Sequence, residues 1–316
     1  MEKKPLVIIG GATGVGKSEL SIRLAKQING EVISADSMQV YRRFDIGTAK
    51  ISPEEMCGIP HHLIDILDPD QEFNVYEFKR LATQAIDDIC SRGHTPVIVG
   101  GTGFYIQSVI YDIDFTDQSP DTAYRDQLEA LANEHGGIYL HNMLKEKDPA
   151  SAEIIHQNNI KRMIRALEYL HETGEPISEH NEEQRRRSSP YNFAYFVLDR
   201  ERKTIYDRIN KRVDFMMEQG LEDEIRSLLG SGLSRSCPAI QGIGYKEISA
   251  YIDGEMTLDE AVSLLKQHTR NFAKRQNTWF KREKDVIWMR YEDFSSTDEM
   301  TAEMLHILKQ KGIANV

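Results

Sequence analysis

Residues 11–18 of this 316-residue chain read GATGVGKS and fit the pattern G-x-x-x-x-G-K-[ST]. The apolar run Leu6–Ile9 before them predicts a buried strand, and residues 18–27 behind them show the apolar spacing of a helix. A glycine-rich turn from strand to helix aims backbone N–H groups and the positive end of the helix dipole at phosphate oxygens. The stretch therefore predicts a phosphate-binding loop in preference to a merely structural glycine turn.

The candidate diphosphate- or nucleotide-binding residues of this loop are Gly11, Ala12, Thr13, Gly14, Val15, Gly16, Lys17 and Ser18. In such loops the lysine reaches the outer phosphate and the serine hydroxyl can ligate Mg²⁺. The pattern alone does not identify the phosphate compound. Residues 210–214 exceed the guanine-reading pattern N-K-x-D by one residue, and residues 100–103 end a strand in glycines where ATP hydrolases carry an acid. GTPases and ATP hydrolases are therefore disfavoured.

Strand and helix patterns alternate outward from the loop. The predicted strands are residues 6–9, 31–34, 96–99, 193–198 and 286–289, and the first predicted helices are residues 18–27 and 74–90. This alternation predicts a parallel sheet covered by helices. Polar runs at 116–121 and 182–190 bracket helical sequence, so we expect a discontinuous core domain, 1–115 with 192–316, and a helical insertion domain, 116–191.

Composition narrows the class of protein. Hydrophobic residues make up 40% and charged residues 28% of the chain, and no apolar stretch is long enough to predict a membrane span. The amino end does not have the pattern of a signal peptide, so we expect a cytoplasmic protein. Three separated cysteines support neither a disulfide framework nor a zinc site. The net charge of −11 argues against a surface coated with basic residues but leaves room for one basic groove.

Two further predicted strands end in residues that can do chemistry. Asp36 follows the second strand and can act as a general base or hold Mg²⁺, although a helix cap is an equally good interpretation. Gln39 carries an amide that can read an adenine edge. Thr102 follows the glycines of the third strand and is expected to face a ligand, unless those glycines serve only close packing.

The last third of the chain is rich in cations. Arg208 and Arg212 lie four residues apart, a spacing that suits a diphosphate or a solvated helix face. Residues 270–284 contain six basic residues and one acid, with aromatic residues interleaved. This segment predicts a nucleic-acid groove or, alternatively, an amphipathic helix with Phe272 and Trp279 in the core.

Together these motifs resemble the tRNA dimethylallyltransferases, also called tRNA isopentenyltransferases. The resemblance extends over nearly the whole chain, through residues 11–18, 36–41, 99–103, 159–168, 239–247 and 269–280. Asn159 stands where the family leads us to expect Asp, and both residues cap helices. The resemblance implies an α/β fold, a P-loop NTPase-like parallel sheet core flanked by helices, with a helical insertion domain that contacts tRNA.

The resemblance also implies an activity, the transfer of a dimethylallyl group from dimethylallyl diphosphate to N6 of the adenosine beside the anticodon. Asp36 would then be the base, Thr13 and Thr102 would position the reactants, and Arg208 would join the loop and Mg²⁺ at the leaving diphosphate. The implied tRNA-binding residues are Asp36, Ser37, Met38, Gln39, Thr102, Arg125, Lys161, Arg162, Arg165, Lys274 and Arg275.

The implied partners are the anticodon stem-loop of tRNA and dimethylallyl diphosphate, with no membrane and no protein partner, so we expect a monomer. A small-molecule kinase with ATP on the loop is the main alternative function. A non-catalytic RNA-binding module that keeps the loop as a scaffold is a third. The kinase would consume ATP without RNA, and the module would bind tRNA whether or not Lys17 is present.

Overall fold

A computed structural model describes residues 3–115 and 122–314, so the predicted polar break at 116–121 lies outside the described residues. The chain forms two compact units. Unit 1 consists of Met1–Ile110 and Pro190–Val316, and unit 2 consists of Tyr111–Ser189. Across the described ranges, no helix combines the length and the apolar character needed to cross a membrane.

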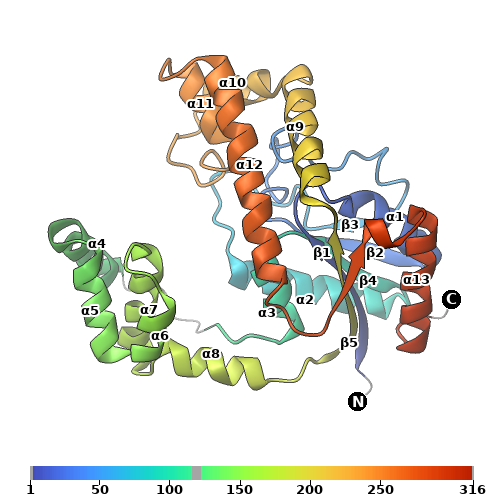
Figure 1. Ribbon diagram of the computed structural model, residues 1–316, viewed down its shortest axis with the longest axis horizontal. Helices are drawn as coiled ribbons and strands as arrows, with labels where there is room; N and C mark the ends of the chain where they lie inside the picture. Colours follow the sequence, from blue (N-terminus) through green and yellow to red (C-terminus); the bar gives the residue numbers. More distant parts are fainter. Residues whose placement is uncertain (1–2, 116–121, 315–316) are drawn as a thin grey trace. The chain divides into compact units, whose positions relative to one another are not determined.

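Unit 1 is built on a six-stranded parallel sheet with the order β3-β2-β4-β1-β5-β6 (Figure 1). Its strands are β1 Lys4–Gly11, β2 Gly30–Ala35, β3 His61–His62, β4 Thr95–Gly100, β5 Tyr191–Asp199 and β6 Val286–Arg290. Val7 of β1 pairs with Val97 on one side and with Ala194 on the other, so strands separated by most of the chain are neighbours. The predicted α/β fold is confirmed.

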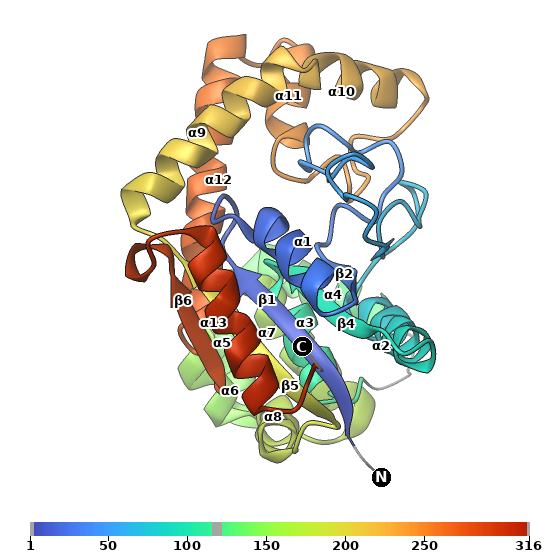
Figure 2. The same ribbon diagram turned by 90° about the vertical axis from the view of Figure 1, so that its right-hand side faces the viewer.

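Helices cover both faces of this sheet. The helices of unit 1 are α1 Lys17–Gln27, α2 Val75–Ser91, α3 Gly103–Ile110, α9 Arg202–Glu218, α10 Leu221–Gly230, α11 Tyr245–Ile252, α12 Leu258–Phe280 and α13 Thr297–Gln310. Val7 and Ile9 share a core with Leu20 of α1 and Met304 of α13. The helices α1 and α13 lie beside each other in Figure 2. Successive strand residues face opposite sides, and a Cβ on Gly10 would meet Phe280 of α12. Therefore α1 and α13 cover one face, and α12 packs on the other.

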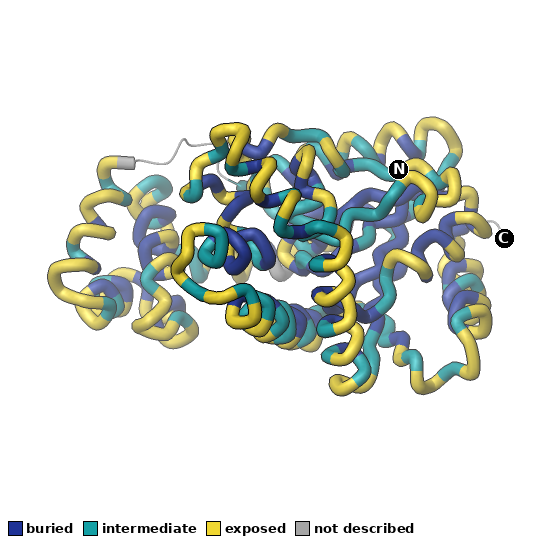
Figure 3. Tube along the Cα trace, turned by 90° about the horizontal axis from the view of Figure 1, so that it is seen from above, coloured by how far each residue is buried: buried dark blue, intermediate teal, exposed yellow. Residues whose placement is uncertain are grey.

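A second core in unit 1 lies around α9, α10, α11 and α12. Phe44, from the segment that follows β2, packs its ring 4.6 Å from that of Tyr245. The Glu224 carboxylate accepts hydrogen bonds from the backbone N–H of Ile46 at 2.7 Å and from the Tyr245 hydroxyl at 2.7 Å. Buried positions, dark blue in Figure 3, thus occur in the loops as well as in the strands.

Unit 2 is helical over its described residues. It contains α4 Thr122–His135, α5 Gly137–Lys147, α6 Pro149–Ile154, α7 Ile160–Thr173 and α8 Ile177–Arg186. Leu128, Leu140, Met163 and Leu167 form the centre of its own core. As expected, Asn159 caps a helix, because its side-chain oxygen accepts a hydrogen bond from the Arg162 N–H.

Two elements differ from the sequence-based expectations. The strand β3 has only two residues, pairing Val32 with His61 and Ile33 with His62, and is too short to leave a period-2 pattern. The helix α8 continues to Arg186, into the polar run predicted to interrupt the chain. Glu, Gln and Arg are good helix formers, so a stretch without apolar residues can still be helical.

Candidate functional site

The loop between β1 and α1 wraps around the ammonium group of its own lysine. Gly14 and Gly16 have φ values of +79° and +113°, which residues with a Cβ rarely adopt. Lys17 Nζ donates to the carbonyl oxygens of Gly11 at 2.9 Å and Ala12 at 3.0 Å. The local sequence therefore folds into a closed turn with its lysine held over the start of the helix.

The groups around Lys17 change the pKa of its ammonium group. Burial lowers the pKa of Lys17 from 10.5 to about 8, the negative charge of Asp36 opposes this shift, and the positive charge of Arg212 adds to it. At pH 7 the ammonium is still mostly protonated, and the negative charge of Asp36 balances only part of the local positive charge. A phosphate anion bound beside it would supply the missing negative charge.

Two arginines of α9 contribute further positive charge. Arg208 Nε donates to the Gly14 carbonyl oxygen at 2.8 Å, which leaves the other guanidinium nitrogens available at the loop. Desolvation and the nearby Arg208 charge lower the pKa of Arg212. Arg208, Arg212 and Lys17 thus form a cationic group around the loop, as the four-residue spacing of the arginines allows.

Arg200 and Tyr291 also support the loop and were not among the residues predicted from the sequence. Arg200 Nε donates to the Val15 carbonyl at 3.0 Å, and the Tyr291 hydroxyl donates to the Gly16 carbonyl at 3.3 Å. The Arg200 guanidinium lies 3.4 Å from the centre of the Tyr291 ring. Both residues directly follow strands, β5 and β6, so the rule that ligands bind at the carboxyl ends of parallel strands could have found them.

Asp36 follows β2 at the same edge of the sheet. Its Oδ1 accepts hydrogen bonds from the backbone N–H groups of Met38 at 2.8 Å and Gln39 at 3.3 Å. The carboxylate therefore caps a turn, where the alternative interpretation expected a helix, and no helix begins there. Its negative charge also contributes to the electrostatic field at Lys17. A role of Asp36 as a general base or Mg²⁺ ligand stays a prediction.

Gln39 is anchored to its own loop. Its Nε2 donates to the carbonyl oxygens of Thr48 and Ala49, both at 3.3 Å. Ser37 and Met38 beside it are partly exposed. Reading of an adenine edge by Gln39 stays a prediction, and it would require the amide to exchange these bonds for contacts with a base.

The second glycine loop joins β4 to α3 beside the first. Thr102 precedes the first residue of α3, Gly103, and is partly exposed. Its backbone N–H donates to the carbonyl oxygen of Ala35, the residue before Asp36, at 3.4 Å. Thr102 and Asp36 therefore lie at neighbouring strand ends.

A buried glutamine on α12 links the two glycine loops. Gln276 is 8% exposed. Its Oε1 accepts from the Thr13 N–H at 2.8 Å, and its Nε2 donates to the Gly101 carbonyl at 3.0 Å. The cations and aromatic residues of this helix were predicted to be functional, and the amide was not. The signal was a polar residue on the apolar face, three residues after Ala273 and four before Phe280.

The helix α12 carries predicted RNA-contacting cations and aromatic residues side by side, because the Arg275 guanidinium lies 5.8 Å from the centre of the Phe272 ring. Lys274 and Arg275 are exposed. The helix buries Ala273, Gln276 and Phe280, whereas Phe272 and Trp279, the residues proposed for the core, are only partly buried. An amphipathic packing helix and a basic exposed face are therefore both present.

The remaining cations predicted to bind tRNA belong to unit 2. Lys161, Arg162 and Arg165 are exposed on α7. Arg125 makes two hydrogen bonds to the carboxylate of Glu168, at 2.7 and 2.8 Å, and Glu168 is 1% exposed. Arg125 thus neutralises a buried acid of its own unit, and its contact with RNA stays a prediction.

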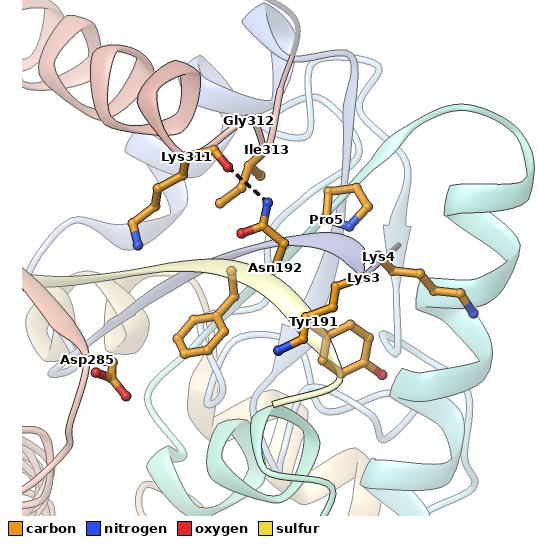
Figure 4. Close-up of a pocket in the computed structure, with 10 residues that line it drawn as sticks. Lys3, Lys4, Pro5, Tyr191, Asn192, Asp285, Lys311, Gly312 and Ile313 are labelled. Carbon is orange, nitrogen blue, oxygen red and sulfur yellow. Dashed lines mark hydrogen bonds between the residues drawn. The ribbon is translucent and has the colours of Figure 1, made fainter. Parts of the chain in front are cut away.

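A pocket of about 850 Å³ lies at the opposite edge of the sheet, around the amino ends of β1 and β5 (Figure 4). Lys3, Tyr191 and Asp285 line it, and Asn192 donates a hydrogen bond to the Lys311 carbonyl at 2.9 Å. None of the chemical groups described above lines this pocket. The loops at the carboxyl ends of the strands are the better candidate site.

Comparisons with known proteins identify similar chains. The family described as IPP transferase matches residues 39–283, and the family described as isopentenyl transferase matches residues 4–66. A protein of Lachnoclostridium phytofermentans named tRNA dimethylallyltransferase is 58% identical over 98% of this chain and 99% of its own. One of the same name from Bacillus cytotoxicus is 50% identical over 98% of this chain and 96% of its own.

Solved structures show the same similarity. A tRNA isopentenylpyrophosphate transferase from Bacillus halodurans is 46% identical, with a TM-score of 0.73 over 98% of both chains. A eukaryotic dimethylallyltransferase described as acting on tRNA is 31% identical, with a TM-score of 0.84 over 98% of this chain and 79% of its own.

Proposed function

Because this chain belongs to the IPP transferase family, we propose that it transfers a dimethylallyl group from dimethylallyl diphosphate to N6 of the adenosine on the 3′ side of the tRNA anticodon. Diphosphate is released. The observation that carries the proposal is the common position of three strand ends: a phosphate loop with Lys17, a carboxylate at Asp36 and a hydroxyl at Thr102. The enzyme is a tRNA-modifying prenyltransferase.

The phosphate loop binds the leaving group. As the allylic C–O bond breaks, its electron pair departs with the diphosphate, whose negative charge increases. Lys17 and Arg208 are held at the loop before the reaction begins, so they stabilise this charge without first reorganising. Alkyl transfer thus uses a loop geometry that elsewhere serves phosphoryl transfer.

Asp36 is our candidate for the base. N6 of adenine is a weak nucleophile because its lone pair is delocalised into the ring, so its proton must leave as the new N–C bond forms. Both backbone donors to Asp36 bind Oδ1. The proton passes to this carboxylate while N6 bonds to the allylic carbon, and Thr13 and Thr102 position the two reactants.

Mg²⁺ fits the oxygen donors at the loop. Among the described residues, no group of three or more His, Cys, Asp or Glu side chains is placed to hold a metal ion. The Ser18 hydroxyl is exposed at the second position of α1 and offers a hard oxygen, and Asp36 lies within electrostatic range of Lys17 beside it. When bound by Ser18 and the diphosphate, Mg²⁺ would neutralise part of the leaving-group charge.

The tRNA must present an unstacked base. N6 is inaccessible in a stacked anticodon loop, and flipping the adenosine out costs about a few kcal/mol. The exposed cations Lys161, Arg162 and Arg165 of α7 and Lys274 and Arg275 of α12 support binding of the anticodon stem-loop through its phosphates. We therefore expect the affinity for tRNA to fall as the salt concentration rises.

The direct test is to incubate the protein with unmodified tRNA, Mg²⁺ and radiolabelled dimethylallyl diphosphate, with ATP in a parallel reaction. The digested RNA is then analysed for labelled nucleosides. We expect label on N6 of the adenosine beside the anticodon. Unlabelled tRNA together with consumption of ATP would overturn the proposal in favour of a kinase.

The role of Asp36 can be tested with Asp36→Asn, which retains an oxygen to cap Met38 and Gln39 but cannot take up the proton. We expect the single-turnover rate to fall by about 10²- to 10⁴-fold. The dissociation constant for tRNA should change by less than about threefold, because the capping bonds remain. Equal losses in rate and in affinity would contradict its role as the base.

A further inference from the structure

The amide of Gln276 has a fixed orientation. The Thr13 N–H can only donate, so the atom that faces it is the oxygen, and the Gly101 carbonyl can only accept, so the atom that faces it is the nitrogen. An amide satisfies both partners at once. A carboxylate, a hydrocarbon or a cation of similar size would leave at least one of them without a bond.

Each bond of Gln276 holds a different glycine loop. Thr13 belongs to the loop after β1, which we assign to the diphosphate, and Gly101 immediately precedes Thr102 in the loop after β4. The strands β1 and β4 are neighbours in the sheet, but their backbone pairing extends only to Gly10 and Gly100. Beyond that pair the described structure joins the two loops through the Gln276 side chain.

The fit around the amide is close. A Cβ on Gly101 would lie 2.1 Å from Gln276 Nε2, so the absence of a side chain is what admits the amide. The Thr13 N–H is engaged by this amide, which ties this part of the loop to α12.

The packing of α12 on the sheet does not depend on this amide. Ala273 is 2% and Phe280 is 1% exposed, and the Phe280 ring lies edge-on to Tyr195 with its centre 6.4 Å away. These apolar residues attach the helix on either side of Gln276. A buried amide costs free energy unless it is fully bonded, so a position needed only for packing would be served by Leu or Met.

We propose that Gln276 is a positioning residue for alkyl transfer, whose amide fixes the distance between the loop that holds the diphosphate and the loop that carries Thr102. The inference rests on the proposed function, because it assigns the donor to one loop and the acceptor to the other. Errors of about 1 Å in the placement of reactants can cost about a hundredfold in rate. The amide therefore acts on the rate of bond formation, through Thr13 and Thr102, more than on the binding of either substrate.

The first test is Gln276→Met, which keeps the volume and removes both hydrogen bonds. We expect the single-turnover rate of tRNA labelling to fall by about tenfold to a hundredfold, while the dissociation constants for dimethylallyl diphosphate and tRNA each change by less than about threefold. The matched control is Gln267→Met, at an exposed glutamine of the same helix, which should leave all three values unchanged.

The second test is Gln276→Glu, which reports on the hydrogen bonds within a single folded protein. A protonated carboxyl has one acceptor and one donor, like the amide, whereas a carboxylate presents a second oxygen to the Gly101 carbonyl. Burial raises the pKa of such a carboxyl. Relative to the wild-type protein at each pH, its rate should recover at least about fivefold from pH 8 to pH 6, and Gln276→Met should show no recovery.

These measurements separate the possible failures. Wild-type rates in Gln276→Met, or weaker binding of both substrates with an unchanged single-turnover rate, would overturn the positioning role. A flat relative pH profile for Gln276→Glu would overturn the hydrogen-bond basis. If the wild-type protein itself leaves tRNA unlabelled, the failure lies in the proposed function, since every variant is compared with an active wild type.

Discussion

The two glycine loops follow neighbouring strands and carry glycine for different reasons. In the loop after β1, Gly14 and Gly16 have positive φ, so the backbone conformation itself requires glycine. In the loop after β4, a Cβ on Gly100 would lie 2.2 Å from the Ala35 carbonyl oxygen, and one on Gly103 would lie 2.1 Å from Trp279. The first loop requires glycine because of its dihedral angles, and the second requires glycine because neighbouring atoms leave no room for a Cβ.

This difference matches the two tasks. A loop that wraps a diphosphate must curve so that several N–H groups point inward, and this curvature depends on local sequence. A loop that sets the position of one threonine against the other loop needs tight packing, which depends on residues far away in the chain. We therefore expect charge to dominate at the first loop and space to dominate at the second.

The largest effect should come from removing the charge at the first loop. Lys17→Ala should lower kcat/KM for dimethylallyl diphosphate by about 10²- to 10³-fold, because the leaving diphosphate loses its ammonium partner. Steady-state kinetics with saturating tRNA measure this. Lys26→Ala, at an exposed position of the same helix, is the control and should change little. A loss confined to the affinity for tRNA would contradict the assignment of the Lys17 charge to the diphosphate.

At the second loop, the addition of one methyl group should lower both the rate and the stability. Gly101→Ala places a Cβ against Gln276 Nε2, and the amide must give up its bond to one loop. We expect a rate about tenfold to a hundredfold lower and a free energy of unfolding about 1–3 kcal/mol lower, from single-turnover assays and denaturant titration.

The control for this change is Gly230→Ala, where no heavy atom lies within 4 Å of the added Cβ. It should be neutral or slightly stabilising, by less than about 1 kcal/mol. If Gly101→Ala behaves like Gly230→Ala, the second loop is not limited by space.

A smaller effect is expected from Thr102→Val, which keeps the shape and removes the hydroxyl. If Thr102 orients a reactant by one hydrogen bond, the single-turnover rate should fall by about tenfold. The melting temperature should remain close to that of the wild type, because the residue is partly exposed. An unchanged rate would mean that this loop contributes packing alone.

The smallest effect is the pH dependence of the first loop. With the pKa of Lys17 near 8, about a quarter of the free enzyme keeps this charge at pH 8.5, so kcat/KM for the donor should be about fourfold lower than its plateau. Unfolding does not explain such a loss. A lysine pKa below its unfolded value makes the folded state more stable as the pH rises from about 8 to 10.5. A rate profile that stays flat to about pH 9.5 would contradict this.

The features that depend on the local sequence pattern could be predicted from the sequence. The apolar strands, the phosphate loop and the acid after β2 follow from periodicity and from the rule that parallel strands end at one edge. The order of the strands could not be predicted, because it depends on pairing between distant segments, such as that of β5 with β1. The sequence marks Arg200 and Tyr291 as strand-end residues and Gln276 as a polar residue on an apolar face. It could not predict which loop atoms they bind, because these contacts span 185 to 275 positions of sequence.

The place of β5 beside β1 has a consequence for the growing chain. The edge of β1 that pairs with residues 191–198 stays uncovered until synthesis has passed the whole of unit 2. At about 5–20 residues per second, the interval between residue 110 and residue 199 lasts about 4–18 s. For that time an apolar strand with an unpaired edge is open to pairing with other chains, so aggregation is more probable before β5 is made than after it.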